Sequence, residues 1–212
     1  MLLSIIGCAI YAYSEIFQRR QVNSIQAGVV KLVNPSAKIK QLERQFQFTD
    51  TFANRVALAD AYLEKGLNEK ALELYEPALS GLFESNEHVV KQLIDIYYKA
   101  NRYDDVIRVA RKISGNVNFP KSKSNLFYAL ALEKTNKIDL AEKEFKATNH
   151  RFSNYEARYN YGQFLLRMDR KAEAIKLYTT ITDEAEHMSR KEKGESKIWI
   201  NKVIGDCKRL SI

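Results

Sequence analysis

Residues 59–66 read ADAYLEKG, and a small, a large and a small residue follow at fixed distances: Ala71, Tyr75 and Ala78. The pattern recurs three times further along the chain, where the residues equivalent to Tyr62 are Tyr97, Leu132 and Leu165. The steps between these four positions are 35, 35 and 33 residues. A repeat of this length, with apolar side chains three or four positions apart inside it, predicts one pair of antiparallel helices per unit.

We therefore expect four helical hairpins over residues 50–188. The expected helix pairs are 51–65 with 68–82, 86–100 with 103–114, 122–135 with 138–149, and 154–168 with 171–187. The turn inside each hairpin contains a residue suited to ending a helix in the left-handed conformation: Gly66, Asn101, Asn136 and Asp169. The second unit departs from the small-then-large pattern at Val106 and Ala110, and a polar loop around residues 115–123 connects it to the third.

This spacing resembles that of tetratricopeptide (TPR) repeat proteins over residues 50–187. The resemblance implies an all-α fold, a right-handed TPR α-solenoid of about four hairpins that cover one another's apolar faces. Residues 189–212 begin with a charged stretch and continue as an amphipathic helix, which is expected to cap the solenoid, with Trp199 packed on the fourth hairpin. Residues 21–49 are expected to form a linker and a short lead-in helix through about residue 47.

The N-terminal residues 1–20 are predicted to be a hydrophobic membrane segment. The first thirteen residues carry no charge, three aromatic residues precede the charged end, and Arg19 and Arg20 follow. A helix of about 17 residues reaches roughly 25 Å, which is short but sufficient for a bilayer. The basic residues, from Arg19 onward, all follow the apolar run, so the positive-inside rule places the repeats in the cytoplasm. The alternatives are an interfacial helix or an apolar helix buried against the solenoid.

A second resemblance concerns the order of these parts. The order of an apolar segment followed by TPR units resembles that of bacterial membrane-attached TPR proteins, whose N-terminal apolar region is similar to that of cardiolipin synthase and phospholipase D. It rests on residues 7–16 (GCAIYAYSEI), 78–84 (ALSGLFE) and 151–162 (RFSNYEARYNYG), and on the closing helix. It implies attachment to the bacterial inner membrane. Such proteins have two apolar segments, whereas this sequence shows one, and it contains no phospholipase catalytic motif.

Composition limits the classes of function. The chain has 212 residues, a net charge of +8 and a pI near 9.3, so acidic partners are favoured. No nucleic-acid-binding motif accompanies the charge, which makes nucleic acid an unlikely ligand. The two cysteines stand near opposite ends of the sequence and the three histidines are scattered, so we expect no disulfide framework, metal or cofactor. No phosphate-binding loop or nucleophile motif is present, and we expect no enzymatic activity.

The predicted binding surface is the concave face, which the first helix of each hairpin should line. An aromatic, amide and basic mixture there suits an extended peptide. The predicted groove residues are His88, Lys91, Tyr98, Lys123, Phe127, Tyr155, Tyr159, Asn160, Gln163 and Arg167. The alternative for the tyrosines is ordinary packing between hairpins. Asp95, where an asparagine would be needed one turn after Lys91, disfavours the carboxylate-clamp mode of chaperone-tail binders.

Two functional hypotheses follow. The first is a membrane-anchored TPR adaptor that binds a protein or peptide in its groove. The second is a basic membrane-surface protein that binds anionic lipid or nucleic acid directly, whose affinity would fall steeply with salt. The sequence leaves the identity of the partner and the oligomeric state open.

Overall fold

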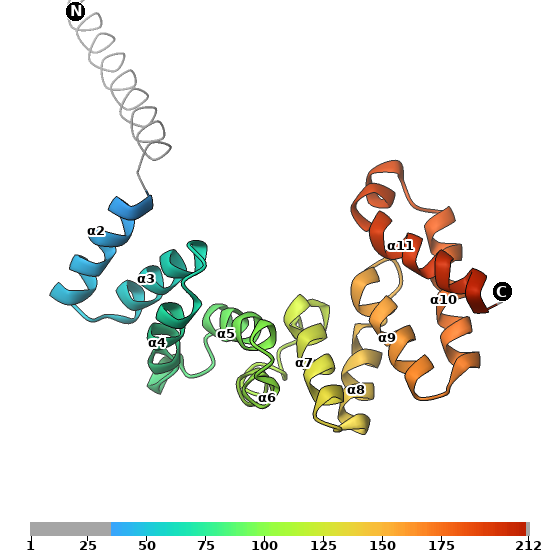
Figure 1. Ribbon diagram of the computed structural model, residues 1–212, viewed down its shortest axis with the longest axis horizontal. Coiled ribbons are helices and arrows are strands. Elements are labelled where there is room, and N and C mark those ends of the chain that lie inside the picture. The colour runs from blue at the N-terminus through green and yellow to red at the C-terminus, as the bar shows by residue number, and fades with distance from the viewer. Residues whose placement is uncertain (1–34, 211–212) are drawn as a thin grey trace, which may run out of the picture. The chain divides into compact units, whose positions relative to one another are not determined.

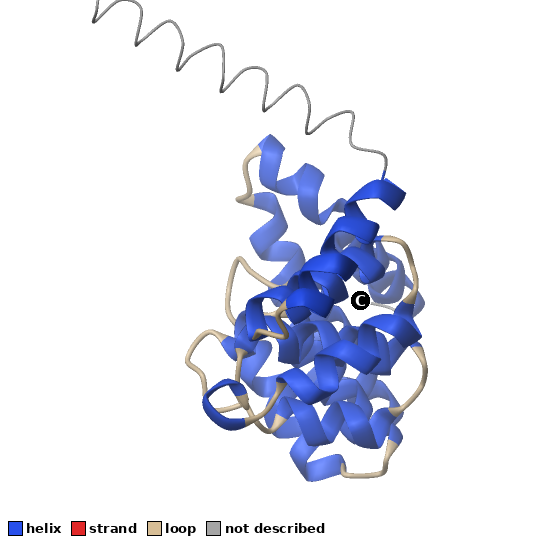
Figure 2. Ribbon diagram, turned by 90° about the vertical axis from the view of Figure 1, so that its left-hand side faces the viewer, coloured by secondary structure: helices blue, strands red, loops and turns tan. Residues whose placement is uncertain are grey.

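The computed structural model describes residues 35–210, and every regular element in this range is a helix (Figures 1 and 2). The predicted membrane segment 1–20 and the first part of the predicted linker lie outside the described residues. Within residues 35–210, no helix combines the length and the apolar character needed to cross a membrane. The all-α prediction is confirmed for the described part of the chain.

The described residues form two compact units, and the boundary between Leu74 and Tyr75 falls inside helix α4. Unit 1 contains α2 (Pro35–Phe48), α3 (Phe52–Glu64) and the first part of α4 (Asn68–Ala78). Unit 2 contains the end of α4, η1 (Gly81–Phe83), α5 (Glu87–Lys99), α6 (Tyr103–Ala110), η2 (Phe119–Lys121), α7 (Lys123–Lys134), α8 (Ile138–Thr148), α9 (Tyr155–Arg167), α10 (Lys171–Glu186) and α11 (Arg190–Leu210).

The predicted turn residues all end their helices in the left-handed conformation. Their φ angles are 73° at Gly66, 58° at Asn101, 59° at Asn136 and 59° at Asp169. Three helix starts are capped as well: the side chains of Thr51, Asn86 and Ser122 each accept a hydrogen bond from the backbone N–H three positions later. Local capping therefore accounts for the helix boundaries that the sequence predicts within one to two residues.

Two helices are shorter than predicted. Helix α4 ends at Ala78 rather than at residue 82, because Pro77 interrupts it and Gly81, with φ of 55°, opens a 3-10 turn. Helix α6 ends at Ala110 rather than at residue 114, and tight turns follow, with Ile113 N–H donating to Ala110. The charged stretch at 190–196 is already helical, so α11 is one helix that begins at Arg190.

Unit 1 is held together by the packing of α2 on α3. Tyr62 is buried in this contact, and its hydroxyl donates to Glu43 at 2.7 Å. Burial, together with the Glu43 carboxylate, raises the pKa of Tyr62 to about 12. The lead-in helix predicted from the sequence is thus fixed to the first hairpin by a buried aromatic residue with its hydrogen bond to Glu43, and by an exposed ion pair between Lys38 and Glu64.

Each hairpin of unit 2 combines a small and a large residue at equivalent positions. One lies three residues before, and the other thirteen residues after, the equivalent residue of the repeat, which is Tyr97, Leu132 or Leu165. These pairs are Ala129 with Phe145, Gly162 with Tyr178, and, in reversed order, Ile94 with Ala110. All except Gly162 are fully buried at 0% exposure, and Gly162 is also buried. The second unit, which departs from the sequence pattern, therefore exchanges the small and the large residue, which conserves the volume of the core.

Gly162 shows how close the two helices of the fourth hairpin are. A Cβ atom at this position would lie 2.5 Å from Cζ and 2.7 Å from the hydroxyl oxygen of Tyr178. No side chain fits there unless the tyrosine ring moves. The ring of Tyr178 on α10 thus occupies the space that an alanine on α9 would need.

The connecting loop after α6 contributes to the core, which its polar sequence does not predict. Phe119, at the start of η2, is fully buried and lies 6.2 Å from the ring of Tyr128. Both α7 and α8 contact η2. The loop is therefore anchored to the third hairpin by one aromatic side chain.

Candidate functional site

We call the first helix of each hairpin in unit 2 an A helix. The A-helix face is the set of surface residues on these helices and on α11, and its members in the argument below are Tyr98, Lys123, Phe127, Tyr159, Arg167, Trp199 and Lys202. Its helices are α5, α7, α9 and α11, of which α5 packs on α7 and α9 packs on α11. Arg167 on α9 joins Glu133 on α7 in a two-pronged ion pair, with N–O distances of 2.6 and 2.8 Å. All ten predicted groove residues lie on α5, α7 and α9.

A first aromatic cluster connects α5 and α7 on this face. The rings of Tyr98 and Phe127 stack with centroids 4.3 Å apart and an angle of 8°, and Tyr103 meets Tyr98 edge-on. The ammonium of Lys123 lies 5.4 Å from the Phe127 ring centre, within the range of a cation–π contact. Tyr98 and Phe127 are half-buried, so each keeps an accessible surface. This cluster brings together three of the predicted groove residues.

A second aromatic cluster connects α9 and α11. Tyr159 lies 5.7 Å from Trp199 and 6.1 Å from Tyr178, measured between ring centroids. The ammonium of Lys202 lies 4.1 Å from the Trp199 ring centre. The predicted packing of Trp199 on the fourth hairpin is confirmed. Each cluster therefore combines half-buried rings with a lysine ammonium, which gives the A-helix face two rigid, amphipathic contact areas.

The two predicted amide residues are engaged within the chain. Gln163 donates to the hydroxyl of Tyr178 at 2.7 Å and to Asp206 at 2.5 Å, and so ties α9 to α10 and α11. Asn160 donates to the backbone oxygen of Glu156 at 2.8 Å. Gln163 therefore serves the junction between helices, whereas the contact of Asn160 stays within α9.

The remaining predicted residues differ in accessibility. His88 is exposed in the first turn of α5, and Lys91 pairs with Glu87 at 2.7 Å. Tyr155 was predicted to line the groove, but only 6% of its surface is exposed. Its hydroxyl lies 3.2 Å from a carboxylate oxygen of Glu184. The packing alternative therefore describes Tyr155, because the first turn of α9 turns it toward the core.

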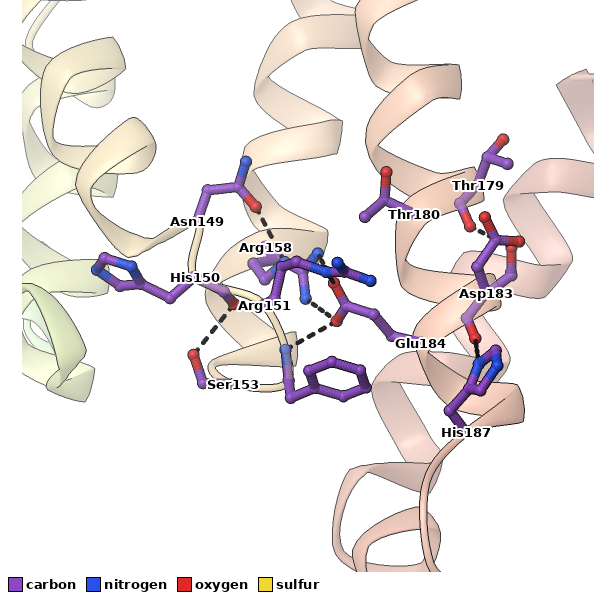
Figure 3. Close-up of polar contacts among 12 residues, drawn as sticks. Asn149, His150, Arg151, Ser153, Arg158, Thr179, Thr180, Asp183, Glu184 and His187 are labelled. Atoms are coloured by element: carbon purple, nitrogen blue, oxygen red, sulfur yellow. Dashed lines mark hydrogen bonds and ion pairs between the residues drawn. The ribbon is translucent and has the colours of Figure 1, made fainter.

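A buried ion pair fixes the start of α9, and the sequence pattern did not identify it. Arg158 and Glu184 are each 1% exposed and are joined by N–O distances of 2.5 and 3.1 Å (Figure 3). Asn149 accepts a further hydrogen bond from Arg158, and the Phe152 N–H donates to Glu184 at 2.9 Å. The loop between α8 and α9 is thus tied to α10. The one sequence feature that indicates this ion pair is Arg158, which stands among the apolar positions of α9.

The charge on Glu184 is maintained by these contacts. Burial raises the pKa of a carboxyl group, but the hydrogen bonds from Arg158 and Phe152 outweigh this effect and hold the pKa of Glu184 below its usual value. Residues 149–154 keep their conformation through this carboxylate, with Phe152 and Asn154 both at positive φ. The cluster has a structural role, since both charges are satisfied inside the protein.

No group of three histidine, cysteine, aspartate or glutamate residues within 35–210 is arranged to hold a metal ion. Cys207, at the end of α11, is half-buried, and burial raises the pKa of its thiol. A thiol with a raised pKa is a poor nucleophile at neutral pH.

Comparison with known proteins identifies relatives in structure alone. No protein-family model and no curated protein matches the sequence. A solved structure of MamA (MSR-1) aligns with a TM-score of 0.60 and 20% identity, covering 80% of this chain and 99% of that one. A structure of MamA (AMB-1) aligns with a TM-score of 0.58 and 22% identity, covering 82% and 96%. YrrB, described as a TPR protein with an unusual peptide-binding site, aligns with a TM-score of 0.61 and 14% identity, covering 82% and 87%.

These similarities establish the fold. Sequence identities of 14 to 22% are too low to carry over function, but the alignments cover most of this chain. The chain therefore shares the helical-repeat fold of a TPR protein, as its spacing predicts. No finding supports the predicted resemblance of the N-terminal segment to the cardiolipin synthase region.

Replacing Arg158 by methionine is expected to lower the free energy of unfolding by about 3–5 kcal/mol, because Glu184 would remain buried without its main partner. The matched control is Lys99→Met, which breaks the exposed pair with Asp95 and should cost less than about 1 kcal/mol. Urea unfolding followed by circular dichroism measures both. Equal, small losses in the two variants would show that the buried pair does not fix α9.

The same pair predicts a pH dependence. The pKa of Glu184 is depressed in the folded state, so its stabilising contribution is complete above about pH 5 and is lost as the pH falls through the folded-state pKa. The difference in unfolding free energy between the wild type and Glu184→Gln should therefore shrink on acidification. A difference that grows as the pH falls would contradict this.

Proposed function

We propose that this protein is a non-enzymatic scaffold that binds an extended protein segment on the A-helix face. The observation that supports it most directly is the presence of two half-buried aromatic clusters on this face, each with a lysine ammonium against a ring. Aromatic side chains give large contact areas at small cost in conformational entropy and dominate many peptide interfaces. The fold adds support, since YrrB is described as having a peptide-binding site.

The arrangement favours a segment that runs across several helices. Tyr98 and Phe127 belong to α5 and α7, Tyr159 and Trp199 belong to α9 and α11, and the Arg167–Glu133 ion pair connects α7 to α9. An extended peptide can contact successive first helices, as repeat proteins bind along their extended surfaces. The A-helix face thus offers separated anchoring points.

Residues 1–20 are proposed to attach the scaffold to a membrane, the bacterial inner membrane, with the repeats on the cytoplasmic side. The support is the uncharged run of thirteen residues followed by Arg19 and Arg20. The full chain, expressed in a bacterium, should stay in the membrane fraction after alkaline carbonate washing, whereas a chain that starts at residue 21 should be released. The repeats should resist protease added to intact spheroplasts. Release of the full chain by carbonate would contradict the proposed anchor.

The A-helix face can be tested with peptides selected from a random display library on the full chain in detergent. Tyr98→Ala should weaken the selected peptides about 5- to 30-fold, because it removes one member of the stacked pair. Leu140→Ala is the matched control, since Leu140 is exposed on α8, a second helix of a hairpin. Its affinity should stay within about twofold of the wild type. Fluorescence polarisation with labelled peptides measures both.

Two outcomes would contradict the proposal. Equal losses in Tyr98→Ala and Leu140→Ala would show that the face is not the binding surface. Ligands that are polyanions, with an affinity that falls steeply with salt and is unchanged in Tyr98→Ala, would favour direct binding of anionic lipid or nucleic acid.

A further inference from the structure

A cavity of about 460 Å³ lies where the start of α9 meets the first half of α11. Three of its lining residues are aromatic: Phe152, Tyr155 and Trp199. Three others are glutamates: Glu156 on α9, and Glu192 and Glu195 on α11. No lysine or arginine lines it, although the chain as a whole carries a net charge of +8. Carboxylates and aromatic rings in one cavity are the combination that recognises an organic cation.

Two of the three carboxylates are available to a ligand. Glu192 is engaged in a capping box, in which its side chain accepts from the Ser189 N–H at 2.9 Å while its own N–H donates to the Ser189 hydroxyl. Glu156 and Glu195 have no ion-pair partner among residues 35–210. Two carboxylates without an ion-pair partner in the same cavity attract a cation more strongly than a single carboxylate does, and water screens the exposed Glu195 more than the half-buried Glu156.

The rings of this cavity already lie in a region where cations and aromatic faces meet. The Arg151 guanidinium lies 5.4 Å from the Phe152 ring centre, Arg158 lies 5.5 Å from that of Tyr155, and Lys202 lies 4.1 Å from that of Trp199. Arg158 is held by Glu184 and is 1% exposed, so it cannot move into the cavity. Each of the three rings is therefore oriented for a cation–π contact, and one face of each is already used by a cation of the chain itself.

One lining residue also has an unmet hydrogen bond. The Nδ2 atom of Asn154 is buried and has no hydrogen-bond partner among the described residues. A side-chain amide donor needs a carbonyl or carboxylate acceptor. A peptide carbonyl next to a bound cationic side chain provides one when the Asn154 amide turns toward the cavity, since the Nδ2 atom is shielded from solvent in its present position.

We propose that this cavity binds the side chain of a lysine or arginine from an extended partner peptide. The inference rests on the proposed function and specifies the chemistry of the partner. Trp199 belongs both to the cavity and to the second aromatic cluster, so a peptide on the A-helix face reaches the cavity without leaving α9 and α11. Glu156 and Glu195 supply the opposite charge, and the rings of Phe152 and Trp199, which keep accessible surface, contact the methylene groups of the side chain.

Trp199 is the single tryptophan of the chain, so its fluorescence reports directly on this cavity. The probes are N-acetyl-argininamide and N-acetyl-lysinamide, with N-acetyl-norleucinamide as the uncharged probe of similar length. We expect a saturable change in fluorescence with the two cationic amides, weakened by added salt, and none with the norleucine amide at the same concentrations. Equal responses to all three amides, or no saturable response to any, would overturn the proposal.

Matched variants separate the cavity from the general charge of the protein. Glu156→Gln with Glu195→Gln keeps the shape of both side chains and should weaken the cationic amides about three- to tenfold. Glu84→Gln with Glu186→Gln removes the same charge at exposed positions outside this cavity and should leave the affinity unchanged. Circular dichroism confirms that each variant is folded. Equal weakening in the two double variants would overturn the proposal.

The selected peptides distinguish a failure of this inference from a failure of the proposed function. Peptides that bind Tyr98-dependently but are not enriched in lysine or arginine, and lose nothing in Glu156→Gln with Glu195→Gln, would overturn the inference and leave the scaffold function intact. Binding of the cationic amides with no peptide selected would instead contradict the scaffold function and support the cation preference of the cavity.

Discussion

The close approach of the two helices in a hairpin is the constraint on which unit 2 depends. Two helices can pack this closely only where one residue of a pair is small, as at Gly162 opposite the ring of Tyr178. The equivalent positions hold Ala129 and Phe145 in the third hairpin and, with the sizes reversed, Ile94 and Ala110 in the second, and all four residues are fully buried. The half-buried residues of the first helices and α11, such as Tyr98, Phe127 and Trp199, form the A-helix face.

The candidate site inherits its geometry from this packing and from one buried ion pair. Arg158 and Glu184 hold the loop before α9 against α10, so the first turn of α9 is fixed where α11 crosses it. The cavity and the second aromatic cluster both lie at this crossing. Side chains on packed helices are positioned more accurately than side chains on loops, which favours specific binding over non-specific association. The acidic cavity also gives a basic protein a local preference for cations.

Features determined by neighbouring residues could be predicted from the sequence, and features determined by distant residues could not. The helix pairs and the turns at Asn101 and Asn136 follow from periodicity and capping, which act within a few residues. The repeat pattern alone predicts that α4 extends to residue 82, whereas the helix ends four residues earlier, next to Pro77. The Arg158–Glu184 pair joins residues 26 positions apart, and Tyr155 turns inward to meet it, so neither could be derived from a helical pattern.

The central claim is that tight contact between paired helices holds the hairpins, and two alanine variants test it most directly. Gly162→Ala should lower the free energy of unfolding by about 1–3 kcal/mol, because the new methyl group must displace the Tyr178 ring. Gly194→Ala, in α11 with no atom within 4 Å of the new Cβ, should raise it by about 0.5–1 kcal/mol through helix propensity. Urea unfolding measures both. Stabilisation of similar size in the two variants would contradict the account.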